Sequence, residues 1–155
     1  LPAGHDMKET DIAREVLRSD VLIAAPVAKS HSSAGVSLGM KGMMGLIYDR
    51  HVMHGRYDLD TSIVDICTKL KADLTVVDAS RVLMSGGPGG PGDVLKAKTV
   101  VASADMVAAD ATTVALFPWY GKRMRPEQIE YLAMAGKRGL GRIDIENLKV
   151  QKVKL

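Results

Sequence analysis

Three short apolar runs constrain the fold of this chain more than any other feature. They occupy residues 21–25, 74–77 and 99–103, and segments with helical periodicity lie between and after them. Runs that are apolar at every position are typical of strands buried on both faces. Strands of this kind alternating with helices predict an α/β fold, a layered domain with a mainly parallel or mixed sheet flanked by helices.

The remaining segments fit around this predicted sheet. The chain has 155 residues, so we expect residues 1–155 to form a single domain. Capping residues and apolar spacing predict helices over residues 10–18, 60–70, 106–117 and 126–138. We expect a helix or broken helix at 33–47, a polar loop at 49–59, a glycine-rich loop at 85–92 and an edge strand at 148–153.

Composition excludes several classes of protein. Hydrophobic residues make up 46% and charged residues 25%, which is enough for a packed interior. Aromatic residues are only 4% and the net charge is +3, so we expect no nucleic-acid partner. No apolar run approaches the roughly 20 residues of a membrane helix, so we expect no transmembrane segment. The single cysteine, Cys67, cannot form an internal disulfide, and this chain alone cannot ligate an iron–sulfur cluster.

Polar residues that follow the predicted strands are the main candidates for a site. Ligands of parallel α/β sheets bind beyond the carboxyl ends of the strands. Lys29 and His31 follow the first run, and Lys29 would supply a point charge while His31 would supply a proton donor or metal ligand. Asp78 follows the second run and Ser103 ends the third. The alternative for Lys29 and His31 is a solvated loop.

Two further residues extend this candidate site. Asp110 lies in an alanine-rich predicted helix, where a carboxylate is costly unless it is paired or faces a cleft. A lysine, Lys29 or Lys41, could pair with it. We therefore expect His31, Asp78 and Asp110 as catalytic candidates, and Lys29, Lys41 and Ser103 as ligand-binding candidates.

The glycine-rich loop is a weaker candidate. Gly87 and Gly89 could present backbone N–H groups to a phosphate or carboxylate. Their spacing with Gly92 formally matches a dinucleotide-binding pattern, but prolines at 88 and 91 interrupt it. A mobile connector explains the loop equally well.

A metal site at His31, His51 and His54 is a third hypothesis. His51 and His54 are spaced so that both rings could meet one ion, but two histidines without a third anchored ligand are a weak signal. The identity of the metal, and of any other cofactor, stays open.

Several segments together resemble a protein family known as domain of unknown function 362. The resemblance runs in order from about residue 20 to 141. The segments that carry it are Asp20-Val21-Leu22-Ile23, Pro26, Lys29-Ser30-His31, Lys41, Met44-Gly45-Leu46-Ile47, Asp73-Leu74-Thr75-Val76-Val77-Asp78, Gly87-Pro88-Gly89-Gly90, Ala102-Ser103-Ala104-Asp105, Asp110 and Gly139-Leu140-Gly141. Gly42 departs from the pattern, because the family usually has Asn after the lysine.

The resemblance has implications for partners and location. Members of this family often carry a ferredoxin-like module, and some carry a twin-arginine export signal. They also normally begin with an N-terminal half that contains a Lys-Pro-Asn stretch. We therefore expect this chain to be the C-terminal half to two-thirds of such a domain, either cytoplasmic or exported with its signal removed. The resemblance implies no particular reaction.

Two functional hypotheses follow. The first is a redox-associated domain that binds an anionic small molecule or cofactor through Lys29, His31 and Lys41. The second is a non-catalytic module that docks a ferredoxin-like iron–sulfur partner, or the missing N-terminal half, through its Gly- and Met-rich segment. Whether the domain is an enzyme and whether it forms a homo-oligomer are left open.

Overall fold

The strand β4 is the centre of a six-stranded mixed sheet. The structure is a computed structural model that describes residues 1–154. The strands β1 and β2 run parallel to β4 along one edge, and β5 and β6 run antiparallel to it along the other. The edge strand β3 pairs antiparallel with β2. The bounds are β1 Ile23–Ala24, β2 Val27–His31, β3 Gly35–Ser37, β4 Leu74–Leu83, β5 Val94–Leu95 and β6 Thr99–Ser103.

Pro26 divides one edge of the sheet into β1 and β2. Proline has no N–H to donate, so it interrupts a ladder of strand hydrogen bonds. The Pro26 carbonyl still accepts a hydrogen bond of 2.8 Å from the N–H of Asp78, and the chain resumes pairing with β4 at Val27. The segment after Pro26, for which a solvated loop was the alternative, is therefore strand β2, and Lys29 and His31 lie on it.

The strand β4 extends beyond the apolar run at 74–77. It does not end at Asp78 but continues to Leu83. Thr75, Val77 and Ala79 face the buried side of the sheet, while Asp78 points to the other side and is exposed. The sequence suggested strands buried on both faces. Instead, the face bearing Asp78 is open, and Val27 and Val100 on it are 50% and 63% exposed.

The antiparallel direction of β6 places its C-terminal end beside the start of β4. Because β6 is antiparallel to β4, its last residue, Ser103, pairs with Thr75 near the start of β4. Lys29 on β2 pairs with Leu83 at the far end of β4. Ser103 and Lys29 are therefore at opposite ends of the central strand.

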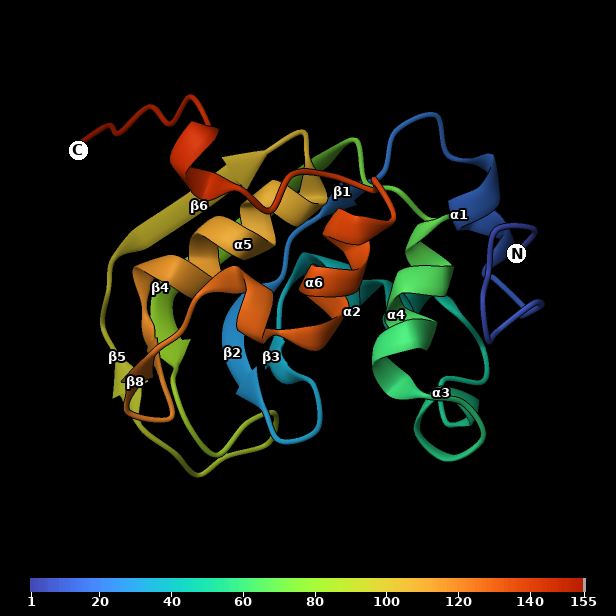
Figure 1. The fold of residues 1–155 in the computed structure, drawn as a ribbon, viewed down its shortest axis with the longest axis horizontal. Coiled ribbons are helices and arrows are strands. Elements are labelled where there is room, and N and C mark those ends of the chain that lie inside the picture. Colours follow the sequence, from blue (N-terminus) through green and yellow to red (C-terminus); the bar gives the residue numbers. More distant parts are fainter. Residues whose placement is uncertain (155) are drawn as a thin grey trace.

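Helices cover the buried face of the sheet (Figure 1). The longest, α5, packs against β4 and β6, and α4 and α6 pack against each other beside it. The bounds are α1 Arg14–Arg18, α2 Gly39–Gly42, α3 Val52–Gly55, α4 Leu59–Cys67, α5 Met106–Leu116 and α6 Glu130–Lys137. This arrangement confirms the predicted α/β class with a mixed sheet and packed helices. None of the helices in residues 1–154 has the length and apolar character that a membrane crossing requires.

The shorter elements differ from the predictions in several places. The segment 33–47 contains β3, α2 and the 3-10 turn η1 Met43–Leu46, and the expected loop at 49–59 contains α3. The expected edge strand at 148–153 is irregular chain. The C-terminal part also contains β7 Pro118–Trp119, β8 Lys122–Arg123, η2 Pro126–Gln128 and η3 Ile145–Asn147.

The hydrophobic core lies between the sheet and the helices. Trp119 and Tyr131 are its largest fully buried side chains. Met40, Met43 and Met44 are also buried in it. The methionines of the Gly- and Met-rich segment therefore contribute to the core and do not form an exposed surface. Cys67 is buried in the same core, where burial raises the pKa of its thiol well above the ordinary value.

The Asp65 carboxylate fastens the N-terminal segment to the helices. It accepts hydrogen bonds of 2.8 Å from the backbone N–H groups of His5, Asp6 and Met7, and it forms a 2.7 Å ion pair with Arg138. Burial raises the pKa of Asp65, but these four donors outweigh burial and hold the pKa below its ordinary value.

Replacing Asp65 should therefore destabilise the fold strongly. We expect Asp65→Asn to lower the free energy of unfolding in urea by about 3 kcal/mol at neutral pH, because it leaves Arg138 and buried N–H groups with poorer partners. A carboxylate with a lowered folded-state pKa stabilises above its unfolded pKa, so the deficit should shrink as the pH falls through the folded pKa. Arg142→Ala, which breaks the exposed 2.6 Å pair with Asp144, should cost less than about 1 kcal/mol. Equal losses for both variants would contradict this role for Asp65.

Candidate functional site

Basic side chains from separate parts of the chain gather beside β2. Lys29 and His31 come from β2, Lys41 comes from α2, Arg50 lies before α3, and His54 lies on α3. Burial first, and then the charges of Lys41, His54 and Lys29, lower the pKa of His31 to about 4. Burial, Lys29 and Arg50 likewise lower the pKa of Lys41. Lys41 therefore lies within electrostatic reach of each of the other four residues, and these five residues are named here the basic cluster.

The basic cluster contains little compensating negative charge. None of its three lysine and arginine side chains forms an ion pair within residues 1–154. The acid that faces it is Asp60, which raises the pKa of Lys41. Burial, Asp58 and Glu130 in turn raise the pKa of Asp60 to about 6, against the opposing effect of Lys41. The cluster keeps a positive field that suits an anionic ligand.

His31 is the least exposed member of the basic cluster. Its side chain is held by the turn that joins β2 to β3, because its Nδ1 accepts N–H hydrogen bonds from Ser33 and Ala34, both 3.2 Å long. Its ring also stacks on that of His54, with centroids 6.1 Å apart and planes at 15°. These contacts fix the orientation of His31 before any ligand binds.

The predicted metal trio does not assemble. His31 already uses Nδ1 to accept backbone hydrogen bonds, and its ring is stacked on that of His54 with centroids 6.1 Å apart. No group of three or more His, Cys, Asp or Glu side chains in residues 1–154 is arranged to hold a metal ion. Cys67, the single cysteine of the chain, is buried and has no cysteine partner with which to ligate an iron–sulfur cluster.

Asp110 holds the start of α2, the helix that carries Lys41. Its carboxylate is fully buried on α5 and accepts the N–H groups of Gly39 at 2.8 Å and Met40 at 2.9 Å, where α2 begins. Burial raises the pKa of Asp110 to about 7, although these two hydrogen bonds lower it. Asp110 therefore positions α2, which carries Lys41, and is not itself exposed to a ligand.

Asp78 lies outside the cluster. Its side chain is on the open face of the sheet, and it accepts a 2.8 Å hydrogen bond from the N–H of Ser80, which lowers its pKa. Asp110 lies on the helix-covered side of the same sheet. The structure thus brings Lys29, His31 and Lys41 together but separates them from Asp78, because β4 passes through Asp78 without ending there.

The two glycines predicted to bind a ligand differ in environment. Gly87 packs on β2: its N–H donates to Ser30 Oγ at 3.0 Å, and its carbonyl accepts from the N–H of Ser32 at 3.2 Å. Its backbone N–H is thus already used inside the protein. Gly89 is exposed, and a side chain there would meet open space. The loop is therefore anchored next to His31 through Gly87.

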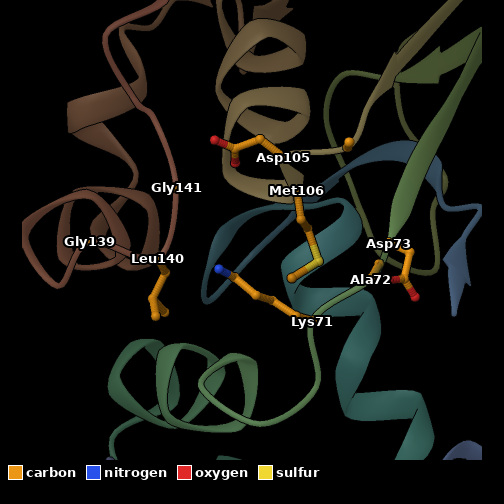
Figure 2. A pocket seen from close by; sticks show the side chains of 9 residues that line it. Lys71, Ala72, Asp73, Asp105, Met106, Gly139, Leu140 and Gly141 are labelled. Carbon is orange, nitrogen blue, oxygen red and sulfur yellow. The ribbon is translucent and has the colours of Figure 1, made fainter. Parts of the chain in front are cut away.

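A separate cavity of about 450 Å³ lies at the other end of β4 (Figure 2). Lys71 extends into it between Met106 and Leu140. Its two acids already have structural partners: Asp73 accepts the N–H of Leu22, and Asp105 caps α5 and accepts the N–H of Arg142. At the same end, Ser103 accepts the N–H of Asp105 at 3.0 Å. Ser103 is thus remote from the basic cluster.

Sequence reasoning did not identify Arg50 and Asp60 as parts of the site. Both lie in segments that carry no recognisable motif. They come near Lys41 only through tertiary packing, in which α4 contacts both α2 and α3. His54 was identified as a metal candidate, and the structure stacks its ring on that of His31. The one usable signal was the concentration of His and Arg between residues 50 and 56.

Alanine substitutions should separate the two glycines. A Cβ on Gly87 would lie 2.0 Å from the carbonyl oxygen of Ser30, so Gly87→Ala must push the loop away from β2. We expect a loss of about 2 kcal/mol in unfolding free energy. Gly89→Ala, with no atom near its Cβ, should change it by less than about 0.5 kcal/mol. Chemical denaturation measures both values, and an unchanged Gly87→Ala variant would contradict the anchoring contact.

Asp110→Asn should show a stability deficit that depends on pH. The amide oxygen can accept one of the two buried N–H groups, so we expect a loss of about 2 kcal/mol at pH 5. Because the folded-state pKa of Asp110 is raised to about 7, its ionisation costs stability as the pH rises from 3.8 to about 7. The difference in unfolding free energy between the wild type and Asp110→Asn should therefore decrease as the pH rises from 5 to about 8. The exposed Asp20→Asn is the control, and a gap that widens with pH would contradict the raised pKa.

Comparison with known proteins agrees with the resemblance seen in the sequence. No match was found among curated proteins or among solved structures. The family described as Domain of unknown function (DUF362) matches residues 1–115. This span includes β1 to β6, the whole basic cluster and most of α5. It starts earlier than the expected resemblance and does not include Gly139-Leu140-Gly141. Since the match covers well over half of the 155 residues, the chain belongs to the DUF362 family.

Proposed function

We propose that this domain binds an anionic small molecule or cofactor at the basic cluster. The observation that carries the proposal is the convergence of Lys29, Lys41 and Arg50 from different elements without ion pairs among residues 1–154. Like charges held close together repel, and burial of Lys41 adds to the cost. A bound anion would offset both costs, and this is a common reason for such clusters at functional sites.

The surroundings of the cluster favour a preformed site. His31 is fixed by the turn after β2, Lys41 is carried by a helix that Asp110 holds, and the glycine-rich loop is fastened to β2 at Gly87. Groups held in place before binding lose little freedom when a ligand arrives, so more of their interaction energy appears as affinity.

The assigned roles are binding roles. Lys29, Lys41 and Arg50 supply positive charge, and His31 and His54 line the site between them. The catalytic roles expected for Asp78 and Asp110 find no support, because the charge that acts on Asp78 is that of Arg81, which is not in the basic cluster, and Asp110 is enclosed. We assign no reaction to the site. The docking hypothesis loses its basis in the Gly- and Met-rich segment, since those methionines are buried.

Removing two of the lysines should abolish anion binding without harming the fold. We expect inorganic phosphate, compared with chloride at equal ionic strength, to raise the melting temperature of the wild type. The Lys29→Ala/Lys41→Ala double variant should bind phosphate at least about tenfold more weakly by calorimetry. Its melting temperature without phosphate should be unchanged or higher, because like-charge repulsion has been removed.

The matched control is Lys149→Ala/Lys152→Ala, which removes the same charge from exposed residues in the C-terminal segment. This control should bind phosphate as the wild type does. Equal weakening in both double variants would show that phosphate responds only to net charge, and the proposed site would then be wrong.

A further inference from the structure

The hydrogen bonds of His31 determine which of its nitrogens carries a proton. Nδ1 accepts the N–H groups of Ser33 and Ala34, both at 3.2 Å, so its lone pair points to the backbone. A neutral imidazole with an accepting Nδ1 carries its proton on Nε2. A proton on Nδ1 would face the N–H groups of Ser33 and Ala34. These two hydrogen bonds, which hold the turn between β2 and β3, would then be lost. The turn therefore holds His31 as the neutral Nε2–H form.

The Nε2 of His31 is free to donate. It makes no hydrogen bond within residues 1–154. In the same part of the chain, the fully buried side-chain atoms without a partner belong to Asp60, Thr75 and Tyr131. The Nε2–H group is thus unpaired and is not one of these fully buried atoms, while His31 as a residue is 6% exposed. The neighbouring Lys29, Lys41 and His54 further disfavour a second proton on the ring.

The charges around His31 indicate the charge of the ligand. Three basic side chains, those of Lys29, Lys41 and Arg50, lie near one acidic side chain, that of Asp60. The excess is two positive charges, which a dianion balances and a monoanion does not. Lysine ammonium groups commonly bind phosphate as point charges, and a phosphoryl group offers three strong acceptor oxygens.

We propose that the basic cluster binds the dianionic form of a phosphoryl group, with His31 as a neutral donor from Nε2 that determines this specificity. The inference rests on the proposed function and adds a ligand class and a role for one residue. If the histidine donor is neutral, the affinity of the site increases with pH as the ligand ionises. A site that depended on a charged His31 would instead weaken as the pH rose.

Two variants separate the donor of His31 from its role in the turn. The Asn side chain of His31→Asn places an oxygen near the position of Nδ1 but does not reach the position of Nε2. This variant therefore keeps the acceptor for the turn and has no donor at the position of Nε2. The Gln side chain of His31→Gln reaches the position of Nε2 and keeps a donor. We expect phosphate affinity to fall at least about tenfold in His31→Asn and less than about threefold in His31→Gln. The melting temperature should fall more in His31→Gln.

The pH dependence tests the charge of the ligand. Lys29, Lys41, Arg50, His54 and Asp60 face the site, and any change in their ionisation affects all dianions alike. The ratio of phenyl phosphate affinity to sulfate affinity therefore reports the ionisation of the ligand and not that of the protein. Sulfate stays dianionic, whereas the second pKa of a phosphate monoester is about 6, so the ratio should rise about tenfold between pH 5 and pH 7. Inorganic phosphate, measured in parallel, distinguishes the free ion from an ester.

Nitrogen-15 NMR of labelled His31 completes the test. We expect an unprotonated Nδ1 and a protonated Nε2 at pH 7, before and after addition of inorganic phosphate. A protonated Nδ1, a constant affinity ratio, or full affinity in His31→Asn would overturn this inference and leave the anion site standing. Failure of the wild type to bind phosphate, phenyl phosphate and sulfate alike would overturn the proposed function, and this inference with it.

Discussion

The buried carboxylate of Asp110 is the interaction on which the site depends. It lies on α5, which packs against the central strand, and it accepts the first two N–H groups at the start of α2. Gly39 is required at this point, because a Cβ would lie 2.9 Å from both Asp110 Oδ1 and Thr75 Cγ2. The helix that carries Lys41 is thereby held against the sheet, despite the cost of burying a carboxylate.

Two other contacts hold the chain around β4 in the same way. Asp65 fastens the N-terminal segment to α4 and α6 by three backbone N–H groups and Arg138. Gly87 fastens the glycine-rich loop to Ser30 beside His31. Each contact satisfies buried polar groups far apart in the sequence, so each fixes the position of a segment that has few regular hydrogen bonds of its own. As a result, the basic cluster draws its side chains from β2, α2, α3 and the segment before α3.

The sequence predicted the α/β class, the strands at 74–77 and 99–103, and one candidate site with Lys29 and Lys41 as ligand-binding candidates and His31 as a catalytic candidate. These predictions relied on apolar runs and on polar residues close to one strand, which are local patterns. Asp78 was misplaced because an acidic residue can lie mid-strand when its side chain faces solvent. Pro26 ends β1 as predicted, but β2 was not predicted, since a proline at a sheet edge can interrupt pairing and let it resume. Ser103 was misplaced because an apolar run carries no information about strand direction. Arg50 and Asp60 join the site only through tertiary packing.

The most direct test of an anion site at the basic cluster is a crystal structure of the protein grown with tungstate, a tetrahedral dianion that anomalous scattering locates without ambiguity. We expect one ion within hydrogen-bond distance of Lys29 Nζ, Lys41 Nζ and His31 Nε2. Tungstate bound instead at the cavity lined by Lys71 and Met106, with none beside His31, would contradict the site.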